Sequence, residues 1–523
     1  EDVKVQIDFK GIEDRIRLVP KTGGMRLHNI QATERYYYYL VVSARRMMMR
    51  ITWDLYAFDT EKLKSEKIAA TITGYGLASG GKHVAILDGS TFQIIKVGSK
   101  VSEKKNDDDD SGGKLNISRN TVMCLDRKAE WGQIFNEGWR VVKYHFYDPN
   151  THGVDWDYMH EYYGSLLPYV RSRQELNMMM TEMVGELNAS HQGVSGGDIP
   201  SVERTSMAFF GADVYLDEET GLPRFKKIFK GGKISTRERS PLDNDFIEVK
   251  AGDYLLAIEG NVIKPGENFY KYLVGKTRNK ITILTNDKPT LKGAVETKFM
   301  PLYSDITLRY KDWVDSNVEK VDTESGGRIG YMHLADMSGS GWTEFREKFE
   351  RYRYKDAIII DVRYNGGGSI DTRVIDYLER RPYHIQQSRG ESPITRPDDV
   401  FAGEVVVLCN EYSYSDAEVF PSAVKERGLG TVIGVPTLGF VIAVTPHYLI
   451  DGGAIRKTFI GIWEESTGAQ LESRGAIPDI IVESTPELEK AGRDVQLEKA
   501  IEFLKEKCCD PRTFDYKTPI EER

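Results

Sequence analysis

Ser415 stands where a strand-like apolar run becomes a helix-like segment, a position from which a hydroxyl can attack a substrate. The run begins at Val405, a short polar turn follows, and the helical pattern after Ser415 ends at Gly428. A serine there has its hydroxyl at the positive end of a helix dipole, beside amides with no partner within the helix. One of these amides belongs to Asp416, and such amides can hold a developing oxyanion. Serine or aspartate before an apolar run usually caps a helix, so these residues alone favour a cap.

A triple glycine follows another strand-like run, in the stretch IIIDVRYNGGGS. Successive glycines such as Gly366 to Gly368 let backbone amides point into one concavity, a geometry that holds anions or an oxyanion. A phosphate-binding loop would need a lysine that the sequence lacks, and the dinucleotide fingerprint is absent. A tight turn is the alternative interpretation, and it is the simpler one for the glycines by themselves.

His191 lies just past a helical segment, in the glycine-rich stretch SHQGVSGGD. Most single histidines near helix ends are structural and complement the helix dipole. Here Ser190 precedes the histidine and Gly193 follows it, and flanking glycines allow the backbone to turn sharply and approach another segment closely. His191 is therefore a candidate base for a hydroxyl nucleophile, provided that two distant parts of the chain pack together.

Four segments with different patterns must position these residues. Residues 1–121 are rich in strands such as YYYYLVV and HVAILDG, separated by turns, which is the rhythm of propeller blades. A blade takes about 40–45 residues and a closed ring needs at least four blades, so we expect the C-terminal part of a truncated propeller. The acidic tract at residues 102–114 is predicted to be a solvated loop.

Residues 122–205 have a helical pattern. The stretch AEWGQIFNEGWRVVKYHFYD places apolar residues at spacings of three or four, which predicts one buried helix face rather than a ligand site. Two further helices are expected over DWDYMHEYYGSLLPYV and SRQELNMMMTEMVGEL. The apolar residues of the first helix are Trp131, Phe135, Trp139, Val142 and Phe146.

Residues 206–288 contain short strands and a predicted helix over GENFYKYLVG. A turn comes first, followed by YLLAIEG, this helix and the strand KITILTN. This order of elements resembles the permuted PDZ domains of bacterial proteases. Such modules receive a peptide C-terminus as an added strand, and a purely structural role is the alternative.

Residues 289–523 alternate apolar strands with helical segments. The strands GRIGYMHL, DAIIIDVRYN, EVVVLCN and GTVIGV predict a largely buried sheet within an α/β unit.

Composition limits the classes of partner. The chain has 523 residues and a net charge of −9 without a basic block, so several domains are expected and a nucleic-acid or anionic-membrane partner is not. The four cysteines, Cys124, Cys409, Cys508 and Cys509, predict neither a disulfide framework nor a metal site. This usage suits a reducing compartment, so we expect a cytoplasmic location, with the periplasm as the alternative if a leader was removed.

The separate motifs together resemble the tricorn protease family, relatives of the tail-specific C-terminal processing proteases. SHQGVSGGD, IIIDVRYNGGGS, NEYSYSDAEVFPSAVKERGLGTVIGVPTLGF and LESRGAIPD occur in the order of that family, and the likeness covers nearly the whole chain. The resemblance implies a multidomain α+β fold with a partial β-propeller, a helical domain, a PDZ domain and an α/β catalytic domain of crotonase/ClpP-like type.

The resemblance also implies roles for individual residues. Ser415 would be the nucleophile and His191 its general base, with Ser190 and Glu472 completing a tetrad. The amide of Asp416 would form an oxyanion hole with an amide from Gly368 or Gly367. Ser473 stands where the family commonly has asparagine.

Peptide hydrolysis through an acyl-enzyme, without a metal or organic cofactor, is what the family implies. Oligopeptides or peptide tails are the expected substrates, and a homo-oligomer, with the hexamer as its unit, is the expected assembly. Two alternatives come from other classes: a non-catalytic peptide-binding scaffold built on the propeller and PDZ modules, and a crotonase-like enzyme acting on thioesters. The pairing of a serine with a histidine and the PDZ-like segment argue against the thioester enzyme.

Overall fold

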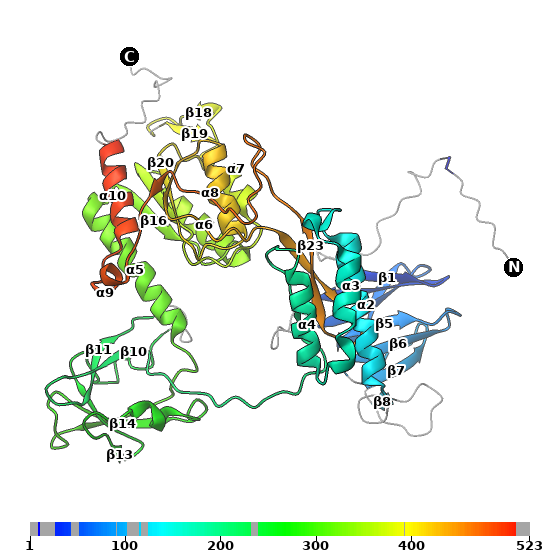
Figure 1. Ribbon diagram of the computed structural model, residues 1–523, viewed down its shortest axis with the longest axis horizontal. Coiled ribbons are helices and arrows are strands. Elements are labelled where there is room, and N and C mark those ends of the chain that lie inside the picture. Colours follow the sequence, from blue (N-terminus) through cyan, green and yellow to red (C-terminus); the bar gives the residue numbers. More distant parts are fainter. Residues whose placement is uncertain are drawn as a thin grey trace. The chain divides into compact units, whose positions relative to one another are not determined.

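The chain divides into two units, Glu1–Asp126 and Arg127–Arg523 (Figure 1). The computed structural model describes residues 9–10, 27–42, 52–89, 91–101, 114–116, 124–231, 239–391 and 393–508. The candidate site residues all belong to the second unit.

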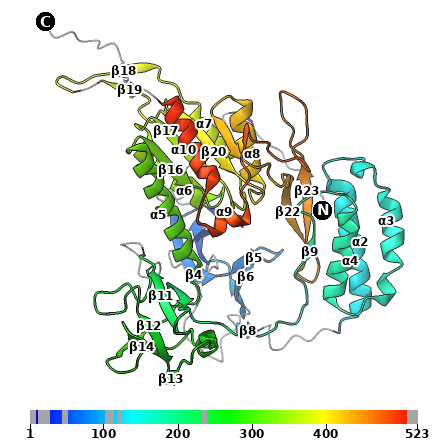
Figure 2. The ribbon, with the colours of Figure 1, turned by 60° about the vertical axis from the view of Figure 1, so that its left-hand side comes forward.

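A five-stranded parallel sheet supports the Ser415 turn (Figure 2). Three of its strands, Ile329–His333, Ala357–Asp361 and Glu404–Cys409, are largely apolar and buried on both faces, as the apolar runs predicted. Helices α6 (Gly339–Tyr352), α7 (Asp371–Leu378) and α8 (Asp416–Glu426) pack on one face, and α5 (Ile306–Ser325) and α10 (Val495–Lys507) on the other. The strand order is β16 (Ile329–His333), β17 (Ala357–Asp361), β20 (Glu404–Cys409), β21 (Thr431–Gly434) and β24 (Ile480–Ile481).

Smaller elements complete this module. Helix α9 (Pro486–Lys490) precedes α10, and β18 (His384–Gln386) pairs with β19 (Ile394–Arg396) in a separate two-stranded hairpin.

The helical module has the predicted order of three helices. These are α2 (Arg127–His145), α3 (Trp156–Gly164) and α4 (Arg173–Gly185), with short 3-10 turns η2 (Thr151–Gly153) and η3 (Leu167–Tyr169) between them. The side chains of Asp155 and Ser172 accept hydrogen bonds from backbone amides in the first turns of α3 and α4, which fixes where these helices begin. The predicted apolar face of α2 forms the core of the module, with Trp139 only partly buried.

A small antiparallel sheet joins the helical module to the α/β module. Strand β9 (Val194–Ser195), just after His191, pairs with β23 (Ala454–Ile460), which pairs with β22 (Ala443–Tyr448). Leu449 and Ile455 from this hairpin are buried in the core of the helices. A buried ion pair of 2.6 Å between Arg173 and Asp451 ties α4 to the turn between β22 and β23. The segment that holds the histidine and the α/β module are thus packed together.

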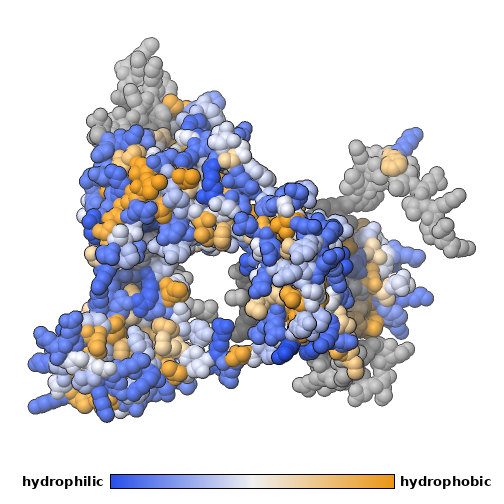
Figure 3. Space-filling view, in the orientation of Figure 1, coloured by the Kyte–Doolittle hydropathy of each residue, from blue (hydrophilic) through white to orange (hydrophobic). Residues whose placement is uncertain are grey.

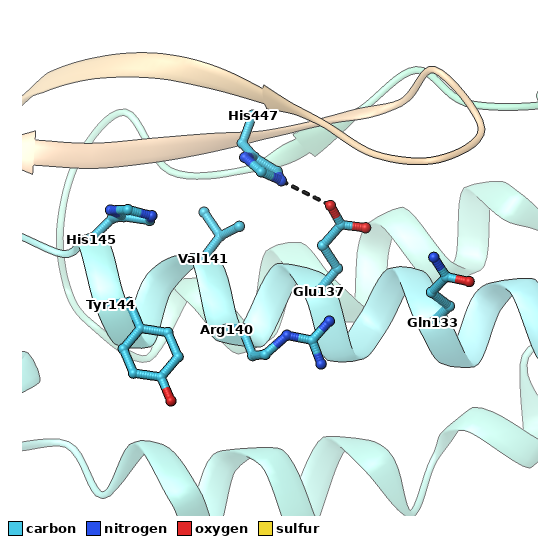
Figure 4. A pocket seen from close by; sticks show the side chains of 7 residues that line it. All are labelled: Gln133, Glu137, Arg140, Val141, Tyr144, His145 and His447. Carbon is cyan, nitrogen blue, oxygen red and sulfur yellow. Dashed lines mark hydrogen bonds and ion pairs between the residues drawn. The ribbon is translucent and has the colours of Figure 1, made fainter. Parts of the chain in front are cut away.

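The same hairpin lies over helix α2, where His447 Nε2 approaches Glu137 Oε1 at 2.9 Å (Figure 4). Beside this pair is an open groove of about 450 Å³, lined mainly by α2. None of the candidate site residues lines this groove.

The PDZ-like segment forms an antiparallel sheet in the order β10 (Ala212–Leu216), β11 (Pro223–Ile228), β12 (Tyr254–Ile258), β14 (Ile281–Asn286) and β15 (Val295–Phe299), and β13 (Asn261–Val262) also pairs with β12. Strand β15 extends the sheet past residue 288, where the sequence placed the end of the segment, because the polar stretch after Asn286 is a hairpin turn and not a linker. The helix predicted over Gly266–Gly275 forms, but it is shorter than predicted. Only the 3-10 helix η5 (Phe269–Leu273) forms there, since Phe269 and Leu273 are both drawn into the core of the sheet.

The first unit contains two four-stranded antiparallel sheets. One is β1 (His28–Ala32), β2 (Tyr36–Val42), β3 (Trp53–Asp59) and β4 (Lys64–Ile72), and the other is β5 (Gly74–Leu77), β6 (His83–Asp88), β7 (Thr91–Lys96) and β8 (Lys114–Asn116). Neither closes into a ring within the described ranges. The predicted solvated loop falls, except for Lys114, outside the described residues.

Hydrophilic residues dominate the face of the molecule seen in Figure 3, with scattered apolar side chains between them. None of the helices in the described part of the chain combines the length and apolar character needed to cross a bilayer.

Candidate active site

Ser415 occupies a strained turn between β20 and α8. Its backbone has φ 57° and ψ −119°, outside the regions that residues with a side chain prefer, which costs about 1–3 kcal/mol. The Ser415 N–H points to two acceptors, Phe440 O at 3.0 Å and Glu418 Oε1 at 3.1 Å. The sequence predicted the position of Ser415 at the start of the helix correctly, and the structure adds the strain.

Glu418 holds this turn in place. Its side chain is fully buried, and besides Ser415 it accepts hydrogen bonds from Thr437 Oγ1 at 2.6 Å, Phe440 N at 2.8 Å and Gly439 N. Burial raises the pKa of this carboxyl, while these hydrogen bonds act in the opposite direction. The sequence analysis missed Glu418, although a serine followed three residues later by glutamate is the signature of a capping box.

Ser190 links His191 to Glu472. The Ser190 hydroxyl lies 2.9 Å from His191 Nδ1 and donates to Glu472 Oε2 at 3.0 Å. The same carboxylate accepts from the backbone amides of Ser190 and, at 3.0 Å, Val441. Ser190 and Glu472 are both buried. The structure therefore brings together three residues that are separated by up to 282 positions in the sequence.

The His191 ring stacks on Tyr414, the neighbour of Ser415, with ring centroids 4.5 Å apart and an interplanar angle of 30°. Burial, and secondarily the positive charge of Arg456, lowers the pKa of His191 to about 4. The imidazole is thus neutral at physiological pH and able to accept a proton. Both side chains are described, and no hydrogen bond of 3.5 Å or less joins His191 to the Ser415 hydroxyl. Such contacts are often longer before substrate binds.

The triple glycine packs directly against the Ser415 turn. A β-carbon at Gly367, where φ is +84°, would lie 2.6 Å from Ser415 Cβ and 3.2 Å from Asp416 N. The Gly367 N–H donates to Asn365 Oδ1 at 2.8 Å. By contrast, the amides of Gly368 and Asp416 have no acceptor among the described residues. These two unpaired amides are therefore available to a substrate oxygen.

The side chain of Asp416 has a different task from its amide. Its carboxylate accepts from the amides of Ile370 at 2.8 Å and Asp371 at 3.1 Å, at the start of α7. Burial, followed by the nearby Asp371 carboxylate, raises the pKa of Asp416 to about 7. This side chain fastens α7 to α8 beneath the glycine loop.

In the described ranges, no group of three or more His, Cys, Asp and Glu side chains is arranged to hold a metal ion.

Three family profiles match successive parts of the chain. Residues 127–185 match the Tricorn protease C1 domain, residues 209–300 the Tricorn protease PDZ domain, and residues 328–482 Peptidase family S41. The chain belongs to the tricorn protease family. The S41 match contains the glycine loop, the Ser415 turn and Glu472, whereas Ser190 and His191 lie just after the C1 match.

Individual tricorn relatives agree with this assignment. Tricorn protease homolog 1 of Streptomyces coelicolor is 30% identical over 453 residues, which cover 86% of this chain and 42% of that protein. The Tricorn protease of Thermoplasma volcanium is 27% identical over 419 residues, covering 80% and 40%. A crystal structure of the tricorn protease superposes with a TM-score of 0.79 at 25% identity, covering 92% of this chain and 47% of that one. The chain thus spans less than half the length of each of these three proteins.

Proposed function

We propose that this chain is a serine peptidase that hydrolyses oligopeptides or peptide tails through an acyl-enzyme. In this proposal Ser415 is the nucleophile, His191 the general base, and Ser190 and Glu472 complete a tetrad. The observation that carries the proposal is the hydrogen-bonded series from Glu472 through the Ser190 hydroxyl to His191 Nδ1, because it ends on an imidazole stacked beside the strained serine turn.

Each contact within the proposed tetrad has a chemical role. A serine hydroxyl is a poor nucleophile until a base removes its proton, and a third group must fix the tautomer of that base. A neutral His191 hydrogen-bonded at Nδ1 can receive the proton of Ser415 on Nε2. The Ser190 hydroxyl and the carboxylate behind it then stabilise the imidazolium.

In the acylation step Ser415 Oγ attacks the peptide carbonyl carbon, and the carbonyl oxygen becomes an oxyanion. The amides of Asp416 and Gly368 would hold this oxyanion, since both lack another acceptor among the described residues. We assign Gly368 rather than Gly367 because the Gly367 amide is already bound to Asn365. His191 next protonates the leaving amine, and water activated by the same imidazole releases the acyl group.

Active-site labelling tests the proposal. A peptidyl phosphonate should label Ser415 in the intact chain, and Ser415→Ala should abolish both labelling and peptide hydrolysis. Ser466→Ala, at an exposed serine outside the site, is the matched control and should behave as the unsubstituted chain. Hydrolysis that persists in Ser415→Ala would place the chemistry elsewhere. An intact chain that binds peptides without labelling or hydrolysis would favour a peptide-binding scaffold.

The other modules have proposed roles that the family suggests. The PDZ-like segment would receive peptide C-termini, and the two sheets of the first unit would be blades of a β-propeller, which their four-stranded antiparallel form supports. A homo-oligomer, with a hexamer as the unit, is the proposed assembly and can be tested by light scattering. The free thiols of Cys124 and Cys409 agree with a cytoplasmic location, and cell fractionation would distinguish it from the periplasm.

A further inference from the structure

A second pocket, of about 620 Å³, opens beside the α/β sheet between α5, the ends of β17 and β20, and the segment that leads into α10. None of the proposed tetrad or oxyanion residues lines it. Its lining includes two nearly buried amide side chains, two aromatic rings and three rim carboxylates. Together these polar, aromatic and acidic groups indicate a ligand-binding site.

Asn410 presents a hydrogen-bond donor to this pocket. The side chain is only 4% exposed, and its Oδ1 accepts from the backbone amides of Tyr364 at 3.2 Å and Tyr412 at 3.1 Å. An amide nitrogen cannot accept these bonds, so the orientation of the side chain is fixed. Its Nδ2 has no acceptor among the residues that the structure describes. A ligand that offers an oxygen would satisfy it.

Asn317 presents the complementary acceptor. This residue of α5 is 8% exposed, and its Nδ2 donates to the Tyr331 hydroxyl at 3.0 Å. That hydroxyl in turn donates to Asp361 Oδ2 at 2.8 Å, so it can only accept from Asn317 and the amide orientation is again fixed. Asn317 lines the pocket, and its Oδ1 therefore lacks a donor within the described ranges. Asn410 and Asn317 together offer one donor and one acceptor, as an amide-containing ligand requires.

The walls of the pocket are aromatic. The rings of Trp313 and Tyr364 lie 6.4 Å apart at 83°, and Tyr364, which is 57% exposed, stacks on Tyr412 at 5.5 Å. Aromatic faces attract ammonium and guanidinium groups.

The charge at the rim is negative. Glu411, Glu483 and Glu489 line the pocket and form no ion pair with any described residue. Two arginines also line the pocket, but both already form ion pairs, Arg363 with Asp361 and Asp494, and Arg493 with Glu498. Burial is the main cause of the raised pKa of Tyr364; the positive charge of Arg363 acts in the opposite direction, and Glu489, Glu411 and Asp494 raise the pKa further. Since Tyr364, Glu411 and Glu489 line the same pocket, a cation held over the tyrosine ring would be attracted by the rim carboxylates.

We propose that this pocket binds a basic group of a peptide, an ammonium or guanidinium next to an amide. The cation lies against the aromatic walls within reach of the rim carboxylates, and the adjoining amide uses Asn410 and Asn317. Two sources share this chemistry: a lysine or arginine side chain, and the α-ammonium group of a peptide N-terminus. Because Asn410 also ties Tyr364 to Tyr412, the ligand contacts the residue that connects the glycine-loop strand to the serine turn.

Calorimetric titration of the full chain carrying Ser415→Ala tests this site without hydrolysis. Acetyl-lysinamide probes a side-chain cation, glycyl-glycinamide an N-terminal cation, and acetyl-glycinamide is the neutral control. We expect saturable binding of at least one cation and none of the neutral amide. Glu411→Gln combined with Glu489→Gln should weaken binding about tenfold, whereas Glu487→Gln, at an exposed glutamate outside the pocket lining, should leave it unchanged.

The two cations distinguish the source. Binding of acetyl-lysinamide alone identifies a basic side chain, and binding of glycyl-glycinamide alone identifies an N-terminus. Equal binding of the neutral amide, no binding of either cation, or affinity unchanged by the double glutamine variant would overturn the proposal. These results are independent of the serine mechanism, because labelling of Ser415 tests that separately.

Discussion

Removing the Ser190 hydroxyl is the sharpest test of the proposed tetrad. Ser190→Ala deletes the contacts to His191 Nδ1 at 2.9 Å and to Glu472 Oε2 at 3.0 Å, and it changes no charge. The Glu472 carboxylate stays in place because the backbone amides of residue 190 and Val441 still donate to it. The substitution therefore separates the carboxylate from the imidazole without removing either.

The expected loss follows from the strength of the missing interaction. A hydrogen bond to a charged group contributes about 1.5–3 kcal/mol, and the imidazolium forms only as the reaction proceeds. Since about 1.36 kcal/mol corresponds to a tenfold change in rate, kcat should fall about 10- to 150-fold. KM should change little, because the hydroxyl contacts His191 and Glu472 rather than the substrate. Glu472→Gln should lower kcat as well, since it removes the charge that stabilises the imidazolium.

The assay is steady-state hydrolysis of a fluorogenic peptide, with thermal unfolding measured in parallel. Ser190→Thr keeps the hydroxyl and should recover most of the lost activity. If kcat of Ser190→Ala stays within about twofold of the unsubstituted chain while its unfolding is unchanged, the hydroxyl does not act on His191 and the tetrad is refuted.

Three further predictions concern the surroundings of the site. The pKa of His191, lowered to about 4 chiefly by burial and next by Arg456, predicts that kcat/KM persists below pH 6 and that Arg456→Gln moves its acid limb upward. As pH falls from 6.5 toward about 4, the imidazole of His191 is protonated in the unfolded chain before it is protonated in the folded one. The free energy of unfolding, measured by denaturant titration, should therefore decrease over this pH range. Gly367→Ala should abolish phosphonate labelling, because its β-carbon would meet the nucleophile's side chain at 2.6 Å, while Gly366→Ala, with nothing within 4 Å, should retain it. Arg173→Leu breaks the buried ion pair to the β22–β23 turn and should cost about 3–5 kcal/mol of unfolding free energy, with parallel loss of activity; full activity at unchanged stability would contradict the dependence on module packing.

Local patterns in the sequence predicted the elements that carry the site. The apolar run before Ser415 and the helical pattern after it are properties of consecutive residues, and β20 and α8 follow them closely. The same holds for α2, whose apolar residues at spacings of three and four face one core. The helix expected over Gly266–Gly275 formed only as a short 3-10 helix, because packing of two of its side chains into the sheet prevailed over local preference.

Other parts of the site depend on contacts that no local pattern contains. Glu418 could have been found from its spacing to Ser415, but its bonds to residues 437–440 could not. The β22–β23 hairpin was missed because its apolar residues are covered by helices from a distant segment rather than by its own module. Likewise, the unpaired atoms Asn410 Nδ2 and Asn317 Oδ1 are identified only because the other polar atom of each side-chain amide is hydrogen-bonded in the folded structure.

The sequence by itself determined which residues could do chemistry: a serine before a helix, a histidine among glycines and a triple glycine after a buried strand, whereas Glu472 was assigned only through the family resemblance. Hydrophobic periodicity and turn-forming residues act over a few positions, so they can be read along the chain. The tertiary structure alone decided that the Glu472 carboxylate reaches His191 through Ser190, that the Gly368 amide and not that of Gly367 is free, and that the serine turn is strained. The reason is physical: hydrogen bonds between distant segments form only after burial of the β22–β23 hairpin and the helices has fixed those segments against each other.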